Sequence, residues 1–299
     1  MTKLIKFRAI TEAAKRLNGK VIRTATIPGP KLTEKLQRPV FLKLENTQLG
    51  GSFKARGVLN KFLSLADDVK DKRFVAVSGG NFGIAIAEAA KIFGADVTII
   101  MPKSAPATAI DRVGELGSTV IVESDVHAAF KRAKALAEQG YVVIDDCNDS
   151  LIAEGHGTLA IEFIADCPEL TDVLVAVGGG GMLAGVATAL KAIKPEIRIW
   201  GVETSGASSM HQALRAGKPV NIEVTSIIST LGVPAIDKVM LAFGEEAKLW
   251  VELASGTLIP AAMAIAPKLP AEAVIGIVVC GGNISHQDMS KWVGYSQTL

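Results

Sequence analysis

The sequence predicts an α/β fold in which buried parallel strands alternate with helices. Short apolar runs recur along the chain, and segments of helical length separate them. Glycine or proline stands at the end of most of these elements. Hydrophobic residues make up 49% of the 299 residues, so the chain can bury a large core. Strands that are apolar along their whole length are typical of a parallel sheet with helices on both faces.

The expected strands are the apolar runs that stop at a glycine, a proline or a polar turn: residues 40–45, 73–78, 96–101, 119–122, 141–144, 172–177, 198–202 and 274–279. The expected helices lie between these runs: residues 11–18, 54–62, 84–93, 107–116, 127–138, 151–165, 182–193, 208–216 and 258–266. Residues 21–30 predict a connector of turns, and residues 219–250 are too irregular to place elements.

Composition and charge exclude several classes of protein. The formal net charge is +2 and no basic block interleaves with aromatic residues, which argues against a nucleic-acid partner. No stretch approaches about 20 apolar residues, so no membrane span is expected. The N-terminus lacks the apolar stretch and cleavage site of a secretory signal, so a cytoplasmic protein is expected. Three separated cysteines and four histidines without ligand spacing argue against zinc and disulfides.

Four expected strands lead into loops of unusual composition, residues 50–54, 78–83, 178–181 and 280–283. Ligands of open parallel sheets bind outside the carboxyl ends of the strands. We therefore expect these four loops to carry the function.

The first of these loops places Lys54 at the start of a helix, directly after Gly50-Gly51-Ser52-Phe53. Amide dipoles at a helix start carry positive partial charge, which disfavours an ammonium. A partly desolvated lysine there should lose its proton more readily, and a neutral amine can form a Schiff base. The alternative is an ordinary surface lysine beside a turn.

The four consecutive glycines of residues 178–181 follow a strand and precede a helix. Without side chains the backbone can approach an anion closely, and the helix start offers free N–H groups, so this loop predicts a phosphate site. The same loop satisfies a dinucleotide fingerprint, Gly179-x-Gly181-x-x-Ala184, with Glu203 at the end of the next strand. On this loop alone a nicotinamide or flavin enzyme stays an alternative.

The loop from Ser78 to Gly83 is a second turn between strand and helix that is rich in N–H groups. It can hold a carboxylate, and the amide of Asn81 can donate to a phenolic or carboxylate oxygen. Taken alone, this composition is also common in ordinary turns.

Together these loops resemble the pyridoxal-phosphate enzymes of fold type II, the tryptophan synthase β-like family, and within it the serine/threonine dehydratase and serine racemase group. The matching stretches occur in the order of that family and span nearly the whole chain: residues 43–46, 51–57, 78–83, 154–162, 177–185, 201–203 and 280–283. A dinucleotide-binding enzyme, the alternative for the glycine loop, would not account for Lys54.

The resemblance implies two open, mostly parallel twisted sheets with helices on both faces, and pyridoxal 5'-phosphate in the cleft between a larger and a smaller domain. Residues 1–66 and 148–299 would form the larger domain, and residues 67–147 a smaller mobile domain that closes over the substrate. We also expect a homodimer. Since the chain ends soon after Asn283, no regulatory domain is expected behind the catalytic part.

The resemblance also assigns roles to individual residues. Lys54 would be the catalytic Schiff-base lysine. The remaining cofactor contacts would come from Phe53, Asn81, Gly178, Gly179, Gly180, Gly181, Met182, Gly232 and Cys280. The substrate carboxylate would bind at Ser78, Gly79, Gly80, Asn81 and Phe82.

The implied reaction is the α,β-elimination of L-serine, L-threonine or a related 3-hydroxy amino acid to a 2-oxo acid and ammonia. Cys280 would face the pyridine nitrogen, and because a thiol is a weak donor the ring is a modest electron sink that suits elimination. The freed amine of Lys54 would take the Cα proton.

Three departures from the family pattern bear on this expectation. Serine racemases carry a serine where this chain has Gly79, which offers no second base, so little racemisation is expected. Phe82 replaces the usual histidine and makes the predicted carboxylate pocket more apolar. The family's divalent or monovalent cation site would use Glu203, the carbonyl of Ala207 and Ser209, but a serine in place of the acidic ligand holds a divalent ion poorly.

Two further classes stay as alternatives. One is a β-replacement enzyme related to cysteine or threonine synthases, against which Phe82 is a mild argument. The other is a protein that binds pyridoxal phosphate or amino acids without catalysis.

Overall fold

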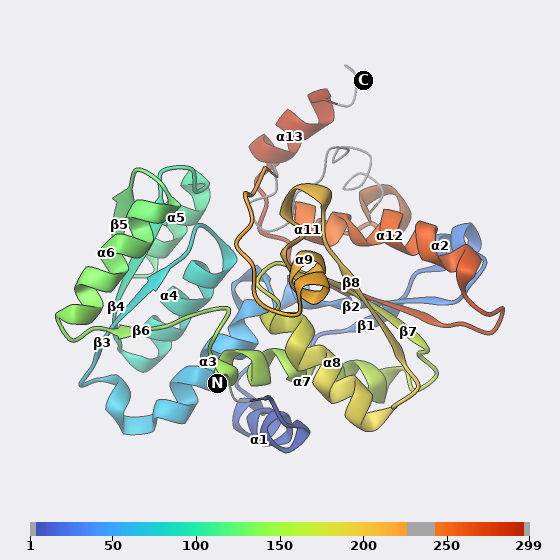
Figure 1. The fold of residues 1–299 in the computed structure, drawn as a ribbon, viewed down its shortest axis with the longest axis horizontal. Helices are drawn as coiled ribbons and strands as arrows, with labels where there is room; N and C mark the ends of the chain where they lie inside the picture. Colours follow the sequence, from blue (N-terminus) through green and yellow to red (C-terminus); the bar gives the residue numbers. More distant parts are fainter. Residues whose placement is uncertain (1–3, 226–242, 296–299) are drawn as a thin grey trace. The chain divides into compact units, whose positions relative to one another are not determined.

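A computed structural model describes residues 4–225 and 243–295, and it contains an α/β fold with two separate sheets (Figure 1). The chain divides into two compact units, each with one sheet. The first comprises Met1–Ile22 and Gln48–Thr158, and the second Arg23–Thr47 and Leu159–Leu299. The predicted fold class of two mostly parallel sheets with helices is confirmed.

The sheet of the first unit has four strands in the order β5-β4-β3-β6, and every neighbouring pair is parallel. The strands are β3 (Arg73–Val77), β4 (Asp96–Pro102), β5 (Thr119–Glu123) and β6 (Val142–Val143). A helix connects each strand to the next one along the chain, because parallel strands need a crossover connection. They are α4 (Asn81–Phe93), α5 (Ala107–Glu115) and α6 (Val126–Glu138).

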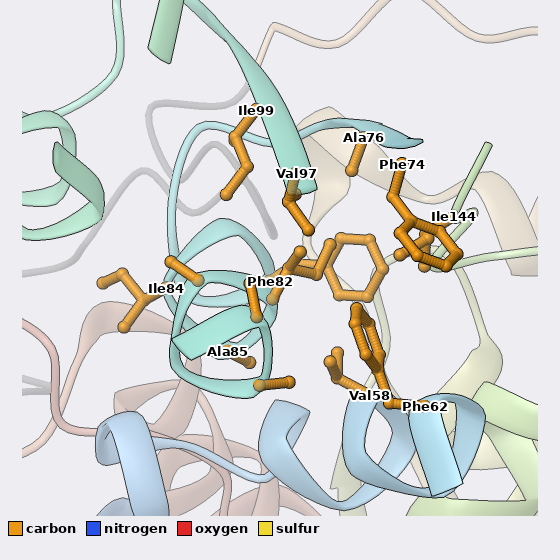
Figure 2. Close-up of a cluster of buried hydrophobic side chains, with 14 of the residues drawn as sticks. Val58, Phe62, Phe74, Ala76, Phe82, Ile84, Ala85, Val97, Ile99 and Ile144 are labelled. Carbon is orange, nitrogen blue, oxygen red and sulfur yellow. The ribbon is translucent and has the colours of Figure 1, made fainter. Parts of the chain in front are cut away.

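Both faces of this sheet are covered, because successive strand residues point to opposite sides. Phe74 and Ala76 of β3 pack with α4 and α5 in one hydrophobic cluster. Val75, between them, packs with α6 in a second cluster. The larger cluster also takes in α1 (Phe7–Leu17) and α3 (Lys54–Leu65), and Figure 2 shows Val58 and Phe62 of α3 among its members.

The sheet of the second unit has five strands in the order β1-β2-β9-β7-β8. The strands are β1 (Thr26–Pro28), β2 (Val40–Leu44), β7 (Asp172–Ala176), β8 (Arg198–Val202) and β9 (Ile275–Val279). Only the edge pair β1 and β2 is antiparallel among the described strand pairs of this sheet. Strands β7 and β9 are buried along their whole length, which explains why they are apolar except for Asp172 at the start of β7.

Helices α8 (Gly181–Ile193) and α12 (Leu258–Ile265) both pack against β7, and Figure 1 shows them on opposite faces of the sheet. The other α-helices of this unit within the described residues are α2 (Pro30–Leu36), α7 (Ser150–Asp166), α9 (Ser209–Ala216), α11 (Leu253–Gly256) and α13 (His286–Tyr295). The first part of α7, up to Thr158, belongs to the first unit.

The structure departs from the predicted elements mainly where proline is dense. Strand β1 lies within residues 21–30, for which the sequence predicted a connector of turns, and α2 begins at the last of these residues and continues into a stretch without a predicted element. Pro30 opens α2, a position that suits proline because the first N–H of a helix needs no partner. Pro28 lies on the edge strand β1, where a missing N–H is tolerated.

The division into units also differs from the predicted domain boundaries at residues 67 and 147. Helix α3 packs against α4, and residues 48–66 and 148–158 accordingly belong to the unit of the four-stranded sheet. That the smaller part closes over a substrate stays a prediction. None of the helices within the described ranges is long and apolar enough to cross a membrane.

Candidate active site

Lys54 is the first residue of α3, as the sequence predicted. The 3-10 turn Leu49–Gly51 precedes it, and Gly50 and Gly51 take positive φ angles of 63° and 74°. These left-handed conformations are open to glycine at little cost, and they form the turn that leads into α3. The Lys54 side chain is 18% exposed, so it is largely withdrawn from solvent.

The ammonium of Lys54 is paired with the carboxylate of Asp146, an ion pair that the sequence analysis did not anticipate. Asp146 lies in the turn after β6, 92 residues further along the chain. Burial by itself raises the pKa of this carboxyl, but Lys54 and His156 outweigh it and hold the pKa of Asp146 well below its usual range. Asp146 is therefore a carboxylate throughout the neutral pH range.

Aromatic rings surround the amine of Lys54. Its Nζ lies 4.8 Å from the centroid of the Phe53 ring and 5.6 Å from that of Phe82. Phe53 itself is 7% exposed and meets the buried imidazole of His156 edge-on, with 4.7 Å between the ring centroids. These rings exclude water from the amine, which strengthens every charge interaction there.

Phe82 lies in the hydrophobic core of the first unit, where Figure 2 shows it in the same cluster as Phe62 and Phe74. It is the second residue of α4 and only 5% exposed. A histidine here would have to bury a polar ring among these side chains, so phenylalanine contributes to core packing as well as to the surroundings of Lys54.

The loop before α4 is built around the hydroxyl of Ser78. Its Oγ accepts hydrogen bonds from the N–H groups of Gly83 at 2.8 Å and Gly80 at 3.3 Å. The predicted carboxylate-binding residues Ser78, Gly79, Gly80, Asn81 and Phe82 therefore form one turn into the helix start. Since the serine side chain shapes this turn, an anion would meet backbone N–H groups and the Asn81 amide.

The glycine loop of the second unit connects β7 to α8. Gly180 precedes the helix with φ 86°, and no side chain caps the helix start. A Cβ on Gly180 would lie 2.9 Å from the methyl carbon of Met210, so both conformation and space call for glycine. The first N–H groups of a helix have no partner within it, and together they form a cradle that fits a phosphate.

Cys280 follows β9 and is buried beside two polar side chains. Its Sγ lies 3.1 Å from Ser255 Oγ and 3.7 Å from a carboxylate oxygen of Glu252. Burial and the nearby Glu252 raise the pKa of the Cys280 thiol, so it stays protonated. The Glu252 carboxylate occupies the space above Gly281, where a Cβ would lie 2.6 Å from its oxygen.

The glycine loop and Cys280 come to the same edge of the five-stranded sheet, because β7 and β9 are parallel neighbours. The end of β8 lies at this edge too, and there Glu203 accepts hydrogen bonds from the N–H groups of Met210 (2.7 Å) and His211 (2.8 Å). Glu203 thus caps the start of α9. Ser209 Oγ lies 3.4 Å from the same carboxylate, close to Ala207 in the chain.

One predicted site residue, Gly232, lies outside the described residues. Within residues 4–225 and 243–295 no group of three or more histidine, cysteine or acidic side chains could hold a metal ion.

Sequence reasoning missed three residues beside the predicted ones, Asp146, His156 and Glu252. Glu252 carries a readable signal, since it is the one charged residue between Lys248 and Lys268. His156 lies in a stretch that matches the family, residues 154–162, but that match assigns it no role, and residues 145–150 carry no predicted element.

Comparison with known proteins agrees with this geometry. A family model described as pyridoxal-phosphate dependent enzyme matches residues 17–281. An L-threonine ammonia-lyase of Thermotoga maritima is 37% identical over 222 residues, which cover 74% of this chain and 55% of that protein. A serine racemase of Arabidopsis thaliana is also 37% identical, over 74% of this chain and 67% of its own length. The match thus spans little more than half of the ammonia-lyase.

Among solved structures, maize serine racemase superposes with a TM-score of 0.87 at 29% identity, over 99% of this chain and all of that one. A serine racemase from Dictyostelium discoideum gives a TM-score of 0.84 at 25% identity, over 95% of this chain and all of that one.

Proposed function

Because the chain belongs to the family of pyridoxal-phosphate-dependent enzymes, we propose that it is an ammonia-lyase of L-serine, L-threonine or a related 3-hydroxy amino acid. The proposed products are a 2-oxo acid and ammonia. The observation that carries this proposal is the amine of Lys54, enclosed by Phe53 and Phe82 at the start of α3. The relative named L-threonine ammonia-lyase supports the same reaction class.

The residues divide the binding of the cofactor among them. The Nζ of Lys54 would hold its aldehyde carbon, and the N–H groups of residues 178–182 its phosphate. The Asn81 amide would donate to the ring hydroxyl, and the Cys280 thiol would face the ring nitrogen. When bound, pyridoxal phosphate supplies an electron-withdrawing ring that makes the Cα proton of an amino acid acidic.

The chain's own residues then handle the proton and the substrate. The turn of residues 78–82 would bind the substrate carboxylate through the N–H groups of Gly79 and Phe82 and the Asn81 amide, because the N–H groups of Ser78 and Gly80 already donate within the protein. Once the substrate amine has replaced it on the cofactor, the freed Nζ of Lys54 would take the Cα proton. The proton from Cα and the β-hydroxyl together account for the water that is lost. The protonated thiol of Cys280 does not place a positive charge on the ring, which favours loss of the β-substituent over other outcomes at Cα.

Gly79 favours elimination over racemisation, although relatives named serine racemase are equally similar. Racemisation needs a proton donor on the face of Cα opposite Lys54, and a glycine has no group to supply one. We further propose that the protein acts in the cytoplasm as a homodimer, and that a cation at Glu203, Ala207 and Ser209 is not needed for activity.

A substrate screen tests the proposal. The purified protein is incubated with L-serine, L-threonine and bulkier 3-hydroxy amino acids, and release of 2-oxo acid is measured. Elimination predicts 2-oxo acid and ammonia in equal amounts from at least one of them. Incorporation of sulfide from a mixture with O-acetylserine, without 2-oxo acid, would instead identify a β-replacement enzyme. Cofactor binding without either product would contradict both activities.

A further inference from the structure

The carboxylate of Asp146 lies beside Lys54, although the reaction proposed above gives it no role. Its Oδ2 contacts Lys54 Nζ, and the two side chains are 27% and 18% exposed. The other oxygen, Oδ1, is buried and accepts no hydrogen bond from any residue in the described parts of the chain. One oxygen of the group therefore faces the reactive lysine and the other faces the interior.

The imidazole of His156 stands behind this carboxylate. Its Nε2 lies 3.9 Å from Asp146 Oδ1, and the side chain is fully buried. Its ring meets Phe53, the residue before Lys54, edge-on. His156 thus touches the surroundings of Lys54 from two directions.

Two glycines on facing helices make room for this arrangement. A Cβ on Gly57 of α3 would lie 2.4 Å from Cε1 of His156, and a Cβ on Gly155 of α7 would lie 2.4 Å from the carbonyl oxygen of Arg56. Real Cβ atoms do not approach so closely. The close passage of α3 and α7 through these glycines therefore brings the imidazole up to the start of α3.

Two neighbouring carboxylates have structural tasks that Asp146 does not share. Asp145 accepts hydrogen bonds from the N–H groups of Cys147 and Asn148 and so holds the turn. Asp149 accepts from the N–H of Leu151 at the start of α7 and pairs with Lys61 of α3 at 2.8 Å. Asp146 is directed at Lys54 instead.

We propose that Asp146 is the positioning residue of Lys54: it holds Nζ as an ammonium when the lysine carries the Cα proton, and His156 fixes the carboxylate from behind. The step balances simply, since Cα loses one proton, Nζ gains it, and the electron pair of the broken bond stays on the substrate side. An anion beside Nζ stabilises the charged product of this transfer. The inference rests on the proposed function.

Asp146 is a charge partner and not a second base. The low pKa of this carboxyl leaves it ionised at neutral pH and makes it a weak proton acceptor. Its contribution is to the stability of the lysine ammonium, through which it acts on the substrate only indirectly.

The first experiment needs no turnover. The full chain, freed of pyridoxal phosphate, is treated with limiting acetic anhydride at fixed pH, and acetylation of individual lysines is followed by peptide mass spectrometry. Asp146→Asn should raise the acetylation rate of Lys54 about tenfold and leave that of Lys61 unchanged. Asp149→Asn is the matched control on the same segment, and it should raise only the rate of Lys61. An unchanged rate at Lys54 in Asp146→Asn would overturn the proposal.

The second experiment addresses the proton transfer in the loaded enzyme. With a substrate deuterated at Cα, Asp146→Asn should lower kcat about tenfold and increase the isotope effect on kcat, while KM changes less. Asp149→Asn should alter neither value. A fall in kcat without a larger isotope effect would mean that Asp146 serves the fold alone, and would contradict the proposal.

His156→Gln keeps the inference testable if Asp146→Asn does not fold. Like Asp146→Asn, this variant should raise the acetylation rate of Lys54 and the isotope effect on kcat, but by about threefold or less. No change in either measurement would contradict the role of His156. If the wild-type chain turned over no 3-hydroxy amino acid, the proposed function would fail, whereas the acetylation rates would still decide the pairing of Lys54 with Asp146.

Discussion

The lysine region of the first unit and the glycine loop of the second unit differ in what they are made of. Around Lys54 the chemistry lies in side chains, namely Asp146, His156 and the rings of Phe53 and Phe82. In the glycine loop it lies in the backbone, with Gly180 in a left-handed conformation before an uncapped helix. Side chains can gain and lose protons, whereas backbone amides only donate hydrogen bonds. The comparison therefore assigns proton transfer to the first region and anion binding to the second.

The sharpest test of this assignment is removal of the amine. Lys54→Ala should reduce release of 2-oxo acid by at least about a thousandfold, because both the covalent link and the base at Cα are lost. The matched control is Lys61→Ala, which removes a second paired lysine of the same helix and should change kcat little. Activity is measured as release of 2-oxo acid. Circular dichroism verifies that both variants are folded. Turnover by Lys54→Ala at the wild-type rate would remove the lysine from the mechanism.

A methyl group on Gly180 tests the other region. Gly180→Ala should weaken pyridoxal phosphate binding about tenfold, since φ 86° and the nearby Met210 disfavour a side chain there. Gly217→Ala provides the same backbone strain, with φ 66° and nothing within 4 Å, away from the site. Both variants should lose about 1 kcal/mol of unfolding free energy, and only the first should change the dissociation constant measured by fluorescence. Equal affinities would mean that the loop does not bind phosphate.

The ion pair of the lysine region should appear in the pH dependence of stability. The pKa of Asp146 is lower in the folded chain than in the unfolded one, so the ionised group stabilises the fold above pH about 4 and this contribution is lost as the pH falls. At pH 7 the free energy of unfolding, measured by urea denaturation, should therefore be about 1 kcal/mol lower for Asp146→Asn than for the wild type.

This difference should narrow at pH 4 and below. Asp111→Asn, which changes a carboxylate on the exposed side of α5, is the control and should alter the free energy of unfolding little at either pH. A difference between wild type and Asp146→Asn that stays constant from pH 7 to well below pH 4 would show that the stabilisation is not the charge pair.

The smallest effect is expected at Gly79. A Cβ there would lie 3.6 Å from Ala105 and Pro102, at ordinary contact distance, so a side chain fits. Gly79→Ser adds a hydroxyl that can move a proton and should give measurable D-serine from L-serine, more slowly than 2-oxo acid. Gly79→Ala adds the same carbon without the hydroxyl and should give none. D-serine from the wild type, at a rate rivalling elimination, would refute the account of Gly79.

The parts of the fold that the sequence predicted are those encoded locally. Buried strands such as β7, after its first residue Asp172, and β9 are continuous apolar runs, and the loops after them carry their glycines in consecutive positions. The family and its cofactor were predicted from these loops, and the match over residues 17–281 confirms them. Helix α2 was not predicted, because Pro30 is as typical of a turn as of the first position of a helix.

The surroundings of Lys54 could not be predicted, because they depend on contacts between distant segments. Asp146 reaches the lysine from 92 residues away, and nothing in its own sequence context distinguishes it from Asp145. His156 meets Phe53 only because Gly57 and Gly155 let two helices approach. Phe82 was expected to line a carboxylate pocket, and its position in the hydrophobic core could be learned only from packing.

Reduction of the purified protein with borohydride tests the central claim most directly. Borohydride converts the link between pyridoxal phosphate and a lysine into a stable bond, and peptide mass spectrometry then identifies the modified residue. The account predicts a yellow protein with the label on Lys54 and an unlabelled Lys61 on the same helix. A colourless protein that takes up no pyridoxal phosphate, or a label on another lysine, would contradict it.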